Sequence, residues 1–351
     1  MSQSMKPSPA DIRKARAENP KLREREFATQ MGITEADYVA AWCGDGVRRI
    51  EADIERLFGG VTDLGEVMAL TRNESAVHEK IGIYEKPVFG KHAAMVLGEQ
   101  IDLRMFPKVW AHGFAVRKQD GDEVRRSLQF FDAAGNAVHK IHLRPASNVD
   151  AYEDLVDSLL SDDQGQTVET RPLSEAVQES SSVIDLDELR QRWGRMTDVH
   201  QFVGILRDLK LTRRRAVELV GEEFAWRIGN DSVPMMMQQA ATAELPIMCF
   251  VGNRGCIQIH SGPINQIKPM GPWLNVMDPT FHLHLRVDHI TEVWAVRKPN
   301  AEGHVTSIEA YDADGSLIIQ FFGKRVEGQD ERAQWRGLVE AFPPLRQSTA
   351  A

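Results

Sequence analysis

Cysteine is scarce in this sequence, and long apolar runs are absent. The 351 residues include three cysteines, Cys43, Cys249 and Cys256, too few for a disulfide framework or for a zinc site of four thiolates. No apolar run reaches membrane-spanning length, and the first residues lack the apolar core of a signal peptide. We therefore expect a protein of the reducing cytoplasm that is not embedded in a membrane.

The sequence also lacks an excess of basic residues. Its 42 Lys and Arg residues face 51 Asp and Glu residues, which gives a formal net charge of -9. A broad phosphate-binding surface needs the opposite sign, so nucleic acid is not an expected partner. Gly-rich phosphate loops, nucleophile elbows and dinucleotide fingerprints are missing as well. The remaining composition, 42% hydrophobic and 26% charged, is that of a globular protein.

An internal repeat is the strongest signal of organisation. The segment F-A-V-R-K at 114–118 matches W-A-V-R-K at 294–298, and S-L-Q-F-F-D-A-A-G at 127–135 matches S-I-E-A-Y-D-A-D-G at 307–315. Both pairs have the same separation of 180 residues. Matches that keep their register over such a distance indicate a tandem duplication.

A polar segment without periodicity separates the two copies. We interpret residues 161–183 as a linker between domains. The predicted organisation is therefore an N-terminal repeat over residues 1–160, the linker, and a C-terminal repeat over residues 184–345.

Each copy changes from helical to strand-like spacing. Residues 9–58, and those that follow the linker as far as Met237, carry apolar residues mostly at helical intervals. Residues 61–143 and 247–322 alternate in short runs broken by turn residues, and a helical piece follows at 152–160. These patterns predict an α+β fold with a tandem structural duplication, two large antiparallel sheets with flanking helices.

The segment W-G-R-M-T-D-V-H-Q-F-V-G, just after the linker, predicts a helix that begins beside a histidine. Thr197 or Asp198 can cap this helix, and Gln201 can complete a capping box. His200 lies at the edge of the apolar stripe, and Gly204 follows one turn later without a side chain. A flat macrocycle can lie over such a glycine while the imidazole binds its iron. The spacing also allows a boundary histidine that only forms hydrogen bonds.

A bound macrocycle with carboxylate groups also needs cations, because a buried unpaired carboxylate is costly. Basic residues in the strand-like segments are the candidates: Arg104, Arg297, Lys298, Lys324 and Arg325. For each of them the alternative is a solvated charge at a strand edge.

Three other histidines are further candidates. His78 lies in a segment that we interpret as a short helix or turn, where it is either a second ligand or a polar surface residue. His282 and His284 alternate along a strand and share a face, which permits a metal pair. Because no nearby carboxylate or cysteine completes such a site, we expect these two side chains to line a sheet face.

Five motifs follow one another along the chain: T-R-N-E-S-A-V-H-E, I-D-L-R-M-F, M-T-D-V-H-Q-F, F-V-G-N-R-G-C-I-Q-I and W-A-V-R-K-P. Together they resemble the haem-utilisation family of HemS, ChuS, ShuS, PhuS and HmuS, and the similarity covers nearly the whole chain. The resemblance implies two structural repeats on large antiparallel sheets, with haem held on the C-terminal side.

The resemblance also implies roles for individual residues. His200 corresponds to the family's proximal iron ligand, and Arg104 to the arginine on the opposite side of the haem. The resemblance also implies haem-binding roles for Lys298, Arg325 and Gln320, with His78 as a second haem contact. Phe322, Phe106 and Gly204 are the further expected haem-binding residues. Phe322 departs from the family, which has tyrosine at this position, so a hydroxyl contact is lost.

Two functions are open for such a protein. We expect it to degrade haem oxidatively and release iron, with Arg104 as the catalytic residue and an external electron donor. The alternative is a haem chaperone or store that hands intact haem to a separate oxygenase. The expected partners are haem, the cytoplasmic face of a haem ABC transporter, and an electron donor or oxygenase. A third alternative is a duplicated scaffold for another planar anionic ligand.

Overall fold

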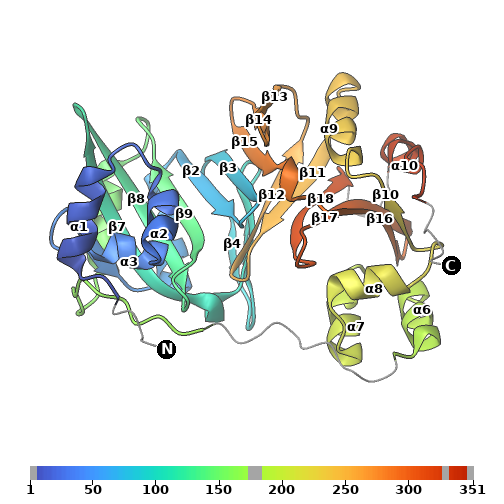
Figure 1. Cartoon of the computed structure of the whole chain (residues 1–351), viewed down its shortest axis with the longest axis horizontal. Coiled ribbons are helices and arrows are strands. Elements are labelled where there is room, and N and C mark those ends of the chain that lie inside the picture. Colours follow the sequence, from blue (N-terminus) through green and yellow to red (C-terminus); the bar gives the residue numbers. More distant parts are fainter. Residues whose placement is uncertain (1–5, 173–183, 326–331, 346–351) are drawn as a thin grey trace. The chain divides into compact units, whose positions relative to one another are not determined.

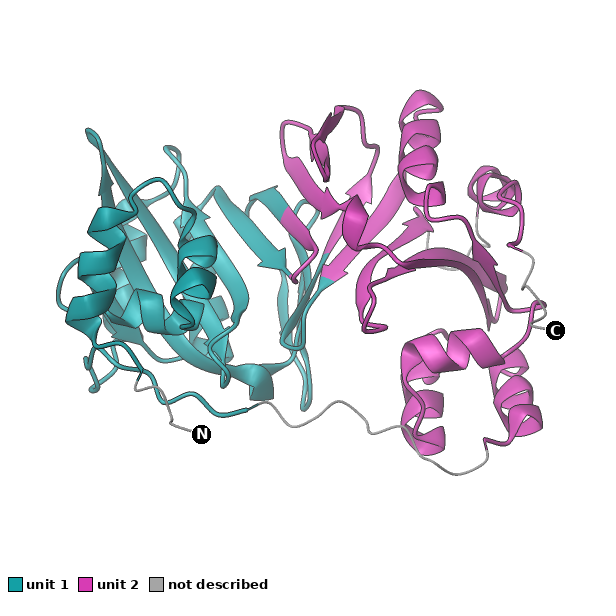
Figure 2. Cartoon of the chain, viewed as in Figure 1, with its two compact units in different colours: residues 1–72, 79–173, 252–258 teal, residues 73–78, 174–251, 259–351 magenta. Residues whose placement is uncertain are grey.

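The chain divides into two units by its internal contacts (Figure 2). Unit 1 comprises residues 1–72, 79–173 and 252–258, and unit 2 comprises residues 73–78, 174–251 and 259–351. The computed structural model describes residues 6–172, 184–325 and 332–345. Each unit thus includes a short segment from the other half of the sequence.

The first half of the chain forms five helices and nine strands among its described residues. The helices are α1 (Pro9–Glu18), α2 (Glu24–Met31), α3 (Glu35–Ala40), α4 (Ile54–Gly60) and α5 (Val149–Ser158). The strands are β1 (Val47–Ile50), β2 (Val67–Arg72), β3 (Ala76–Gly82), β4 (Pro87–Phe89), β5 (Ala94–Leu97), β6 (Asp102–Met105), β7 (Trp110–Asp120), β8 (Glu123–Asp132) and β9 (Ala137–Leu143).

The second half repeats this order of elements. Its helices are α6 (Leu186–Gly194), α7 (Gln201–Leu209), α8 (Arg213–Leu219), α9 (Ser232–Thr242) and α10 (Ala333–Glu340). Its strands are β10 (Ala225–Ile228), β11 (Ile247–Gly252), β12 (Cys256–Gly262), β13 (Ile267–Met270), β14 (Trp273–Met277), β15 (Phe281–Arg286), β16 (Glu292–Asn300), β17 (Gly303–Tyr311) and β18 (Leu317–Gly323). The predicted duplication is therefore confirmed at the level of secondary structure.

The strands form two nine-stranded sheets. Their orders are β1-β7-β8-β9-β2-β3-β15-β14-β13 and β10-β16-β17-β18-β11-β12-β6-β5-β4. Neighbours such as β16 and β17 pair antiparallel, with Lys298 opposite Val305. The predicted fold class, α+β with two large antiparallel sheets and flanking helices, is confirmed. Within the described residues, no helix combines the length and the apolar character needed to cross a membrane.

In unit 2 the sheet is covered by helices on both faces (Figure 1). Val293 and Ala295 of β16 belong to the apolar core under α9 and α10. Trp294 and Val296 point the other way, because side chains alternate along a strand, and they belong to the core formed with α6, α7 and α8. The face of the sheet that meets α6–α8 is the one that carries the candidate site.

Two short strands interrupt segments that the sequence predicts as helical. β1 pairs with β7 through residues such as Val47 and Val116, and β10 pairs with β16 through Ala225 and Val296. Backbone pairing at the edge of each sheet outweighs the helical spacing of the apolar residues here. The helical prediction is therefore wrong for residues 47–50 and 225–228.

The predicted linker is described only in part. Residues 161–172 contact unit 1: the Arg49 backbone N–H donates to Gln164 Oε1 at 3.0 Å, and Val168 is buried in the core beside α1–α3. Residues 173–183 lie outside the described residues.

Unit 1 contains a buried histidine in β9. The ring nitrogens of His139 lie 2.8 Å from Thr71 Oγ1 and 2.7 Å from the Tyr84 hydroxyl. Burial, together with the nearby His142, lowers the pKa of His139 to about 3. The folded protein thus keeps this ring neutral at a pH where the unfolded chain protonates it.

We expect the stability of the protein to fall as the pH is lowered from about 6.5 towards 3. Between the unfolded and folded pKa values of His139, only the unfolded state binds the proton, which costs up to about 1.4 kcal/mol per pH unit. Urea unfolding of the wild-type protein at pH 7, 6 and 5 measures this slope. His139→Gln should make this slope shallower but not remove it, because burial also lowers the pKa of His142, to about 4. The exposed-site control His92→Gln should leave the slope unchanged. A His139→Gln profile parallel to that of the wild type would contradict the assignment.

Candidate functional site

Helix α7 begins directly after His200, which is its N-cap residue. Asp198 Oδ1 accepts hydrogen bonds from the His200 backbone N–H at 2.8 Å and from ring Nδ1 at 2.7 Å. The Thr197 N–H donates to Gln201 Oε1 at 3.0 Å. The predicted helix is confirmed, but its N-cap is His200 and not Thr197 or Asp198, and a turn closed by the Gln201 N–H and the Asp198 carbonyl at 3.1 Å precedes it.

The His200 side chain is exposed and oriented at the same time. Its exposed fraction is 88%. Because a carboxylate only accepts hydrogen bonds, Nδ1 is the nitrogen that donates to Asp198, which leaves Nε2 as the nitrogen that would bind a metal. Hydrogen bonds from the His200 backbone N–H and ring also lower the pKa of Asp198. An imidazole held by a carboxylate at one nitrogen is the usual arrangement of a metal-ligating histidine.

Beside His200, the surface of α7 is apolar and carries only small side chains. Val203, three residues later, is 64% exposed. A Cβ added at Gly204 would meet no atom within 4 Å, so the space over this turn is open. These two residues lie on the same side of the helix as His200. This surface fits the edge of a flat apolar ring bound through His200.

A buried carboxylate lies on the face of the sheet that meets α6–α8. Glu309 Oε1 accepts hydrogen bonds from Lys298 Nζ at 2.7 Å and Gln320 Nε2 at 2.9 Å, and Arg213 Nη1 lies 3.3 Å away. The hydroxyl of Tyr311 donates to Oε2 at 2.6 Å, and that of Ser307 to Oε1 at 3.1 Å. We call these residues the Glu309 cluster: Glu309, Lys298, Arg213, Ser307, Tyr311 and Gln320.

The cluster contains two cations and one carboxylate. Burial raises the pKa of Glu309, but the charges of Lys298 and Arg213 outweigh burial and hold it well below its usual value. Burial and the charge of Arg213 lower the pKa of Lys298, and Glu309 opposes them. Burial raises the pKa of Tyr311, which therefore stays neutral.

Phe202 connects this cluster to the helix that begins at His200. Lys298 Nζ lies 4.8 Å and the Arg213 guanidinium carbon 4.9 Å from the centroid of the Phe202 ring. The ring also packs edge-on against Trp193 of α6 at 4.8 Å. The two cations of the cluster therefore pack against the buried side of α7.

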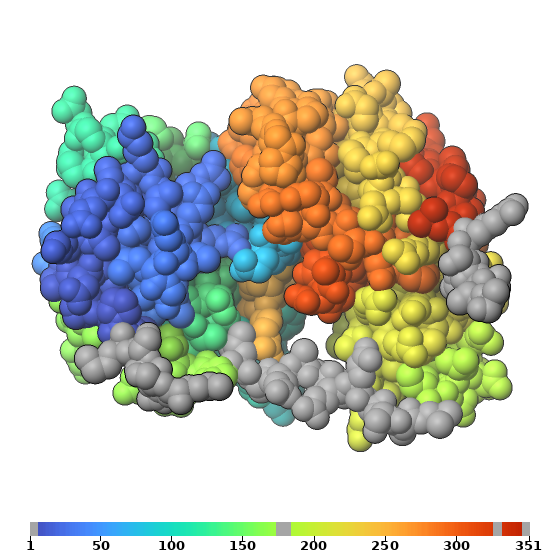
Figure 3. Space-filling model, in the orientation of Figure 1, coloured from blue at the N-terminus to red at the C-terminus, as the bar shows by residue number. Residues whose placement is uncertain are grey.

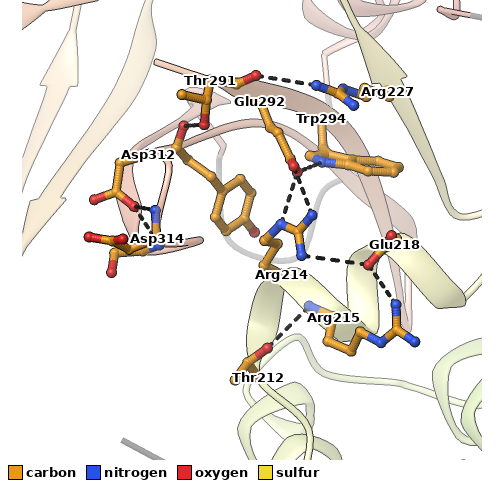
Figure 4. Close-up of polar contacts among 12 residues, drawn as sticks. Thr212, Arg214, Arg215, Glu218, Arg227, Thr291, Glu292, Trp294, Asp312 and Asp314 are labelled. Carbon is orange, nitrogen blue, oxygen red and sulfur yellow. Dashed lines mark hydrogen bonds and ion pairs between the residues drawn. The ribbon is translucent and has the colours of Figure 1, made fainter. Parts of the chain in front are cut away.

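A second ion network fixes α8 to the sheet (Figure 4). Arg214 donates to both oxygens of Glu292, at 3.0 and 2.8 Å, and the Trp294 indole N–H donates to Glu292 at 3.2 Å. Hydrogen bonds from Arg214 are the main cause of the lowered pKa of Glu292. Glu218 of α8 approaches Arg214 and Arg215 at 3.6 and 2.9 Å. The bidentate pair between Arg214 and Glu292 fixes the orientation of α8 on the sheet as well as its distance from it.

The other predicted residues of unit 2 lie at or near the end of β18. Gln320 and Phe322 are both half-buried there, and the Phe322 ring packs against Phe250 at 4.9 Å. Arg325 follows the strand and is exposed. Figure 3 shows the surface of unit 2 hollowed between the dark orange end of the sheet and the yellow helices. The structure thus brings Lys298 of β16 and Gln320 of β18 together, and Phe322 lies on β18 two residues after Gln320.

Arg104 and Phe106 belong to unit 1. Arg104, in β6, is half-buried and pairs with Asp102, whose pKa burial raises. Phe106 follows the strand and is half-buried. Neither residue is therefore a freely solvated strand-edge group.

His78 is placed differently from the prediction. It lies in β3, not in a helix or turn, and its side chain is fully buried. Its ring centroid is 4.9 Å from that of Phe281. The surface alternative for His78 is therefore wrong, because the polar-looking segment alternates its side chains along a strand.

His282 and His284 lie on the partly exposed face of β15, as expected. His284 Nδ1 is 2.6 Å from Asn275 Oδ1. Among the residues that the structure describes, no group of three or more His, Cys, Asp or Glu side chains could hold a metal ion.

Glu309, the centre of the buried cluster, is not among the residues predicted from the sequence. The available signal was an acidic residue at a strand position where the neighbouring repeat has the neutral Gln129. Lone acidic residues in strands are usually solvated, so the pattern alone did not reveal burial.

A duplicated α+β fold, with a carboxylate-oriented imidazole in the second copy, fits the class of haem-utilisation proteins that the motifs resemble. The chain belongs to the family of haemin-degrading HemS.ChuX domains, which matches residues 32–159 in the first repeat and 210–342 in the second. The resemblance stated from the motifs is therefore confirmed. His200 lies between the two matched segments.

Curated relatives extend the similarity across that gap. The chain is 38% identical over 325 residues to the hemin transport protein HmuS of Yersinia pestis. It is also 38% identical over 323 residues to the hemin transport protein HemS of Yersinia enterocolitica. Each comparison covers 92% of this chain and 93% of the relative.

Solved structures agree with this assignment. The structure of holo-PhuS, a heme-binding protein from Pseudomonas aeruginosa, matches with a TM-score of 0.94 and 39% identity, over 97% of this chain and all of that one. ChuS, described as a heme oxygenase of Escherichia coli, matches with a TM-score of 0.86 and 34% identity, over 94% of this chain and 99% of that one. Haem is thus the ligand named for members of this family.

Proposed function

We propose that this chain binds haem through unit 2, with His200 Nε2 as the iron ligand. The observation that carries this proposal is the His200 imidazole, exposed for 88% of its surface and held at Nδ1 by Asp198. Bound haem supplies a Lewis-acidic iron and a conjugated ring open to oxidation. The protein supplies orientation and charge.

Other residues of unit 2 would hold the remaining parts of the ring. Val203 and the open backbone at Gly204 offer an apolar surface beside His200. Phe322, packed on Phe250, offers an aromatic one. Lys298, Gln320 and Arg325 would face the propionates. Arg104 and Phe106 of unit 1, and His78 as a second haem contact, are proposed on the family resemblance.

We further propose that the bound haem is a substrate, degraded oxidatively to release iron in the cytoplasm, with an external electron donor. Arg104 would be the catalytic residue, since a fixed positive charge stabilises negative charge that develops during oxygen chemistry. The likeness to a protein described as a heme oxygenase supports this reading. The names of the hemin transport relatives support delivery of haem from a haem transporter.

A carrier of intact haem, which delivers its cargo to a separate oxygenase, is the second candidate. The observation in its favour is the higher TM-score and identity with a protein described simply as heme-binding. His200 ligation serves both functions equally.

Decay of the Soret band under air distinguishes a haem-degrading enzyme from a carrier of intact haem. The full chain is loaded with one equivalent of haem and given a mild reductant with catalase present. We expect the band to decay with release of chelatable iron, and Arg104→Ala to slow this decay by about a hundredfold or more. Leu103-Arg104 matches Leu285-Arg286 of the second repeat at a separation of 182 residues. Arg286→Ala removes this corresponding arginine and should leave the rate unchanged.

Two results would contradict the enzyme reading. A Soret band that stays constant for hours would make the protein a carrier. Equal rates for Arg104→Ala and the wild type would remove Arg104 from the chemistry.

A further inference from the structure

The charges of the Glu309 cluster do not balance. Glu309 contributes one negative charge, and Lys298 and Arg213 contribute two positive ones. The other members, Ser307, Tyr311 and Gln320, are neutral. Lys298 and Glu309 are almost fully buried, whereas 27% of the Arg213 side chain is exposed, so solvent screens the excess charge in part. The cluster is therefore one carboxylate short of neutrality.

The members of the cluster include residues that the proposed function assigns to the ligand. Lys298 and Gln320 would face a propionate, yet both donate hydrogen bonds to Glu309 Oε1. Gln320 and Arg213 are partly exposed, with 27% of the Arg213 side chain accessible. An outside carboxylate would contact the cluster at these two partly exposed members.

The duplication shows that the fold does not require this carboxylate. At the separation of 180 residues, Glu309 corresponds to Gln129, which is buried in the same way but uncharged. Lys298 corresponds to Lys118, whose side chain is 52% exposed and pairs with Glu24. The buried carboxylate and its buried lysine therefore occur in the copy with His200 and are absent from the equivalent positions of the other.

We propose that Glu309 is a specificity-determining residue that sets the charge of the propionate subsite to a single excess positive charge. One carboxylate of the ligand then neutralises the cluster, and the ligand binds firmly enough to be held but is released readily. Without Glu309, a carboxylate of the ligand would take its place beside Lys298 and Arg213 as their counter-ion, and the ligand would be retained. This inference rests on the proposed function, because it takes haem as the ligand.

The rate of haem release tests this inference. The full chain is loaded with haem, mixed with excess apomyoglobin as acceptor, and the transfer is followed in the Soret region. Glu309→Gln should release haem about tenfold more slowly than the wild type, because one more uncompensated charge holds the propionate. Raising the salt concentration should narrow this difference. Gln320→Glu, which adds a carboxylate to the cluster, should release haem about tenfold faster.

Haem with both propionates esterified is the control ligand. It carries no carboxylate, so the wild type and Glu309→Gln should release it at equal rates. The Soret maximum of each variant should match that of the wild type, since His200 is unchanged. This spectrum separates a charge effect from a displaced helix α7.

Several outcomes would overturn the inference. They are release of native haem from Glu309→Gln at the wild-type rate or faster, and a rate difference that persists with esterified haem. If Glu309→Gln does not fold, the test rests on Gln320→Glu. Haem release from Gln320→Glu at the wild-type rate or more slowly would then refute the inference that one excess positive charge holds the propionate. Failure of the wild-type protein to bind haem is a different result and refutes the proposed function itself.

Discussion

Replacing His200 with alanine is expected to weaken haem binding by more than about a hundredfold. The reason is that even the hydrogen-bonding partners of metal ligands contribute about 10- to 100-fold to affinity, and His200 is the proposed ligand itself. The structure predicts no loss of stability, because this side chain is exposed and its bonds reach only Asp198. Absorbance titration with haem measures the affinity and reports the ligand through the Soret maximum.

Two controls make the His200 result specific. Arg23→Ala changes the corresponding N-cap residue, that of α2, and should bind haem as the wild type does. Added imidazole should restore the wild-type spectrum of His200→Ala, since it supplies the missing ligand in the same place. Wild-type affinity in His200→Ala would support a scaffold for another planar anion that happens to accept haem.

Replacing Lys298 with methionine is expected to destabilise the protein by about 3 kcal/mol. Removing one partner of a buried ion pair leaves the other buried and poorly compensated, which costs about 3 to 5 kcal/mol. In Lys298→Met, Glu309 still contacts Arg213 and still accepts hydrogen bonds from three neutral donors. We therefore expect a loss at the lower end of this range. Urea unfolding at pH 7 measures the loss.

The duplication supplies a matched control for Lys298. Lys118 occupies the equivalent strand position of the first repeat, but it is half-exposed and its pair with Glu24 is screened by solvent. Lys118→Met should therefore change the free energy of unfolding by less than about 1 kcal/mol. Equal losses in the two variants would mean that Lys298 and Glu309 are not a buried pair in solution.

Much of the fold follows from local patterns. Strand alternation in 61–143 and 247–322 and the repeat motifs predict two copies of an antiparallel sheet, because they depend on neighbouring residues and turns. Local patterns do not predict the short strands β1 and β10. Each is four residues long and owes its conformation to a partner strand far along the chain.

The candidate site also contains residues that the local sequence predicts and residues that it does not. His200 and its helix are visible in the sequence, because a cap, an apolar stripe and a glycine lie within ten residues. The burial of His78 and Glu309 is not visible, since it depends on packing between distant elements. Lys298 illustrates the limit: its lysine type suggests a solvated charge, yet Glu309 across the strand pair keeps it buried.

The stoichiometry of haem binding tests the central claim most directly. Haem is titrated into the purified full chain and followed by absorbance in the Soret region. We expect an endpoint at one haem per chain, with a histidine-ligated spectrum that His200→Ala loses. An endpoint of two haems per chain, or an unchanged spectrum in His200→Ala, would contradict a single site built on His200.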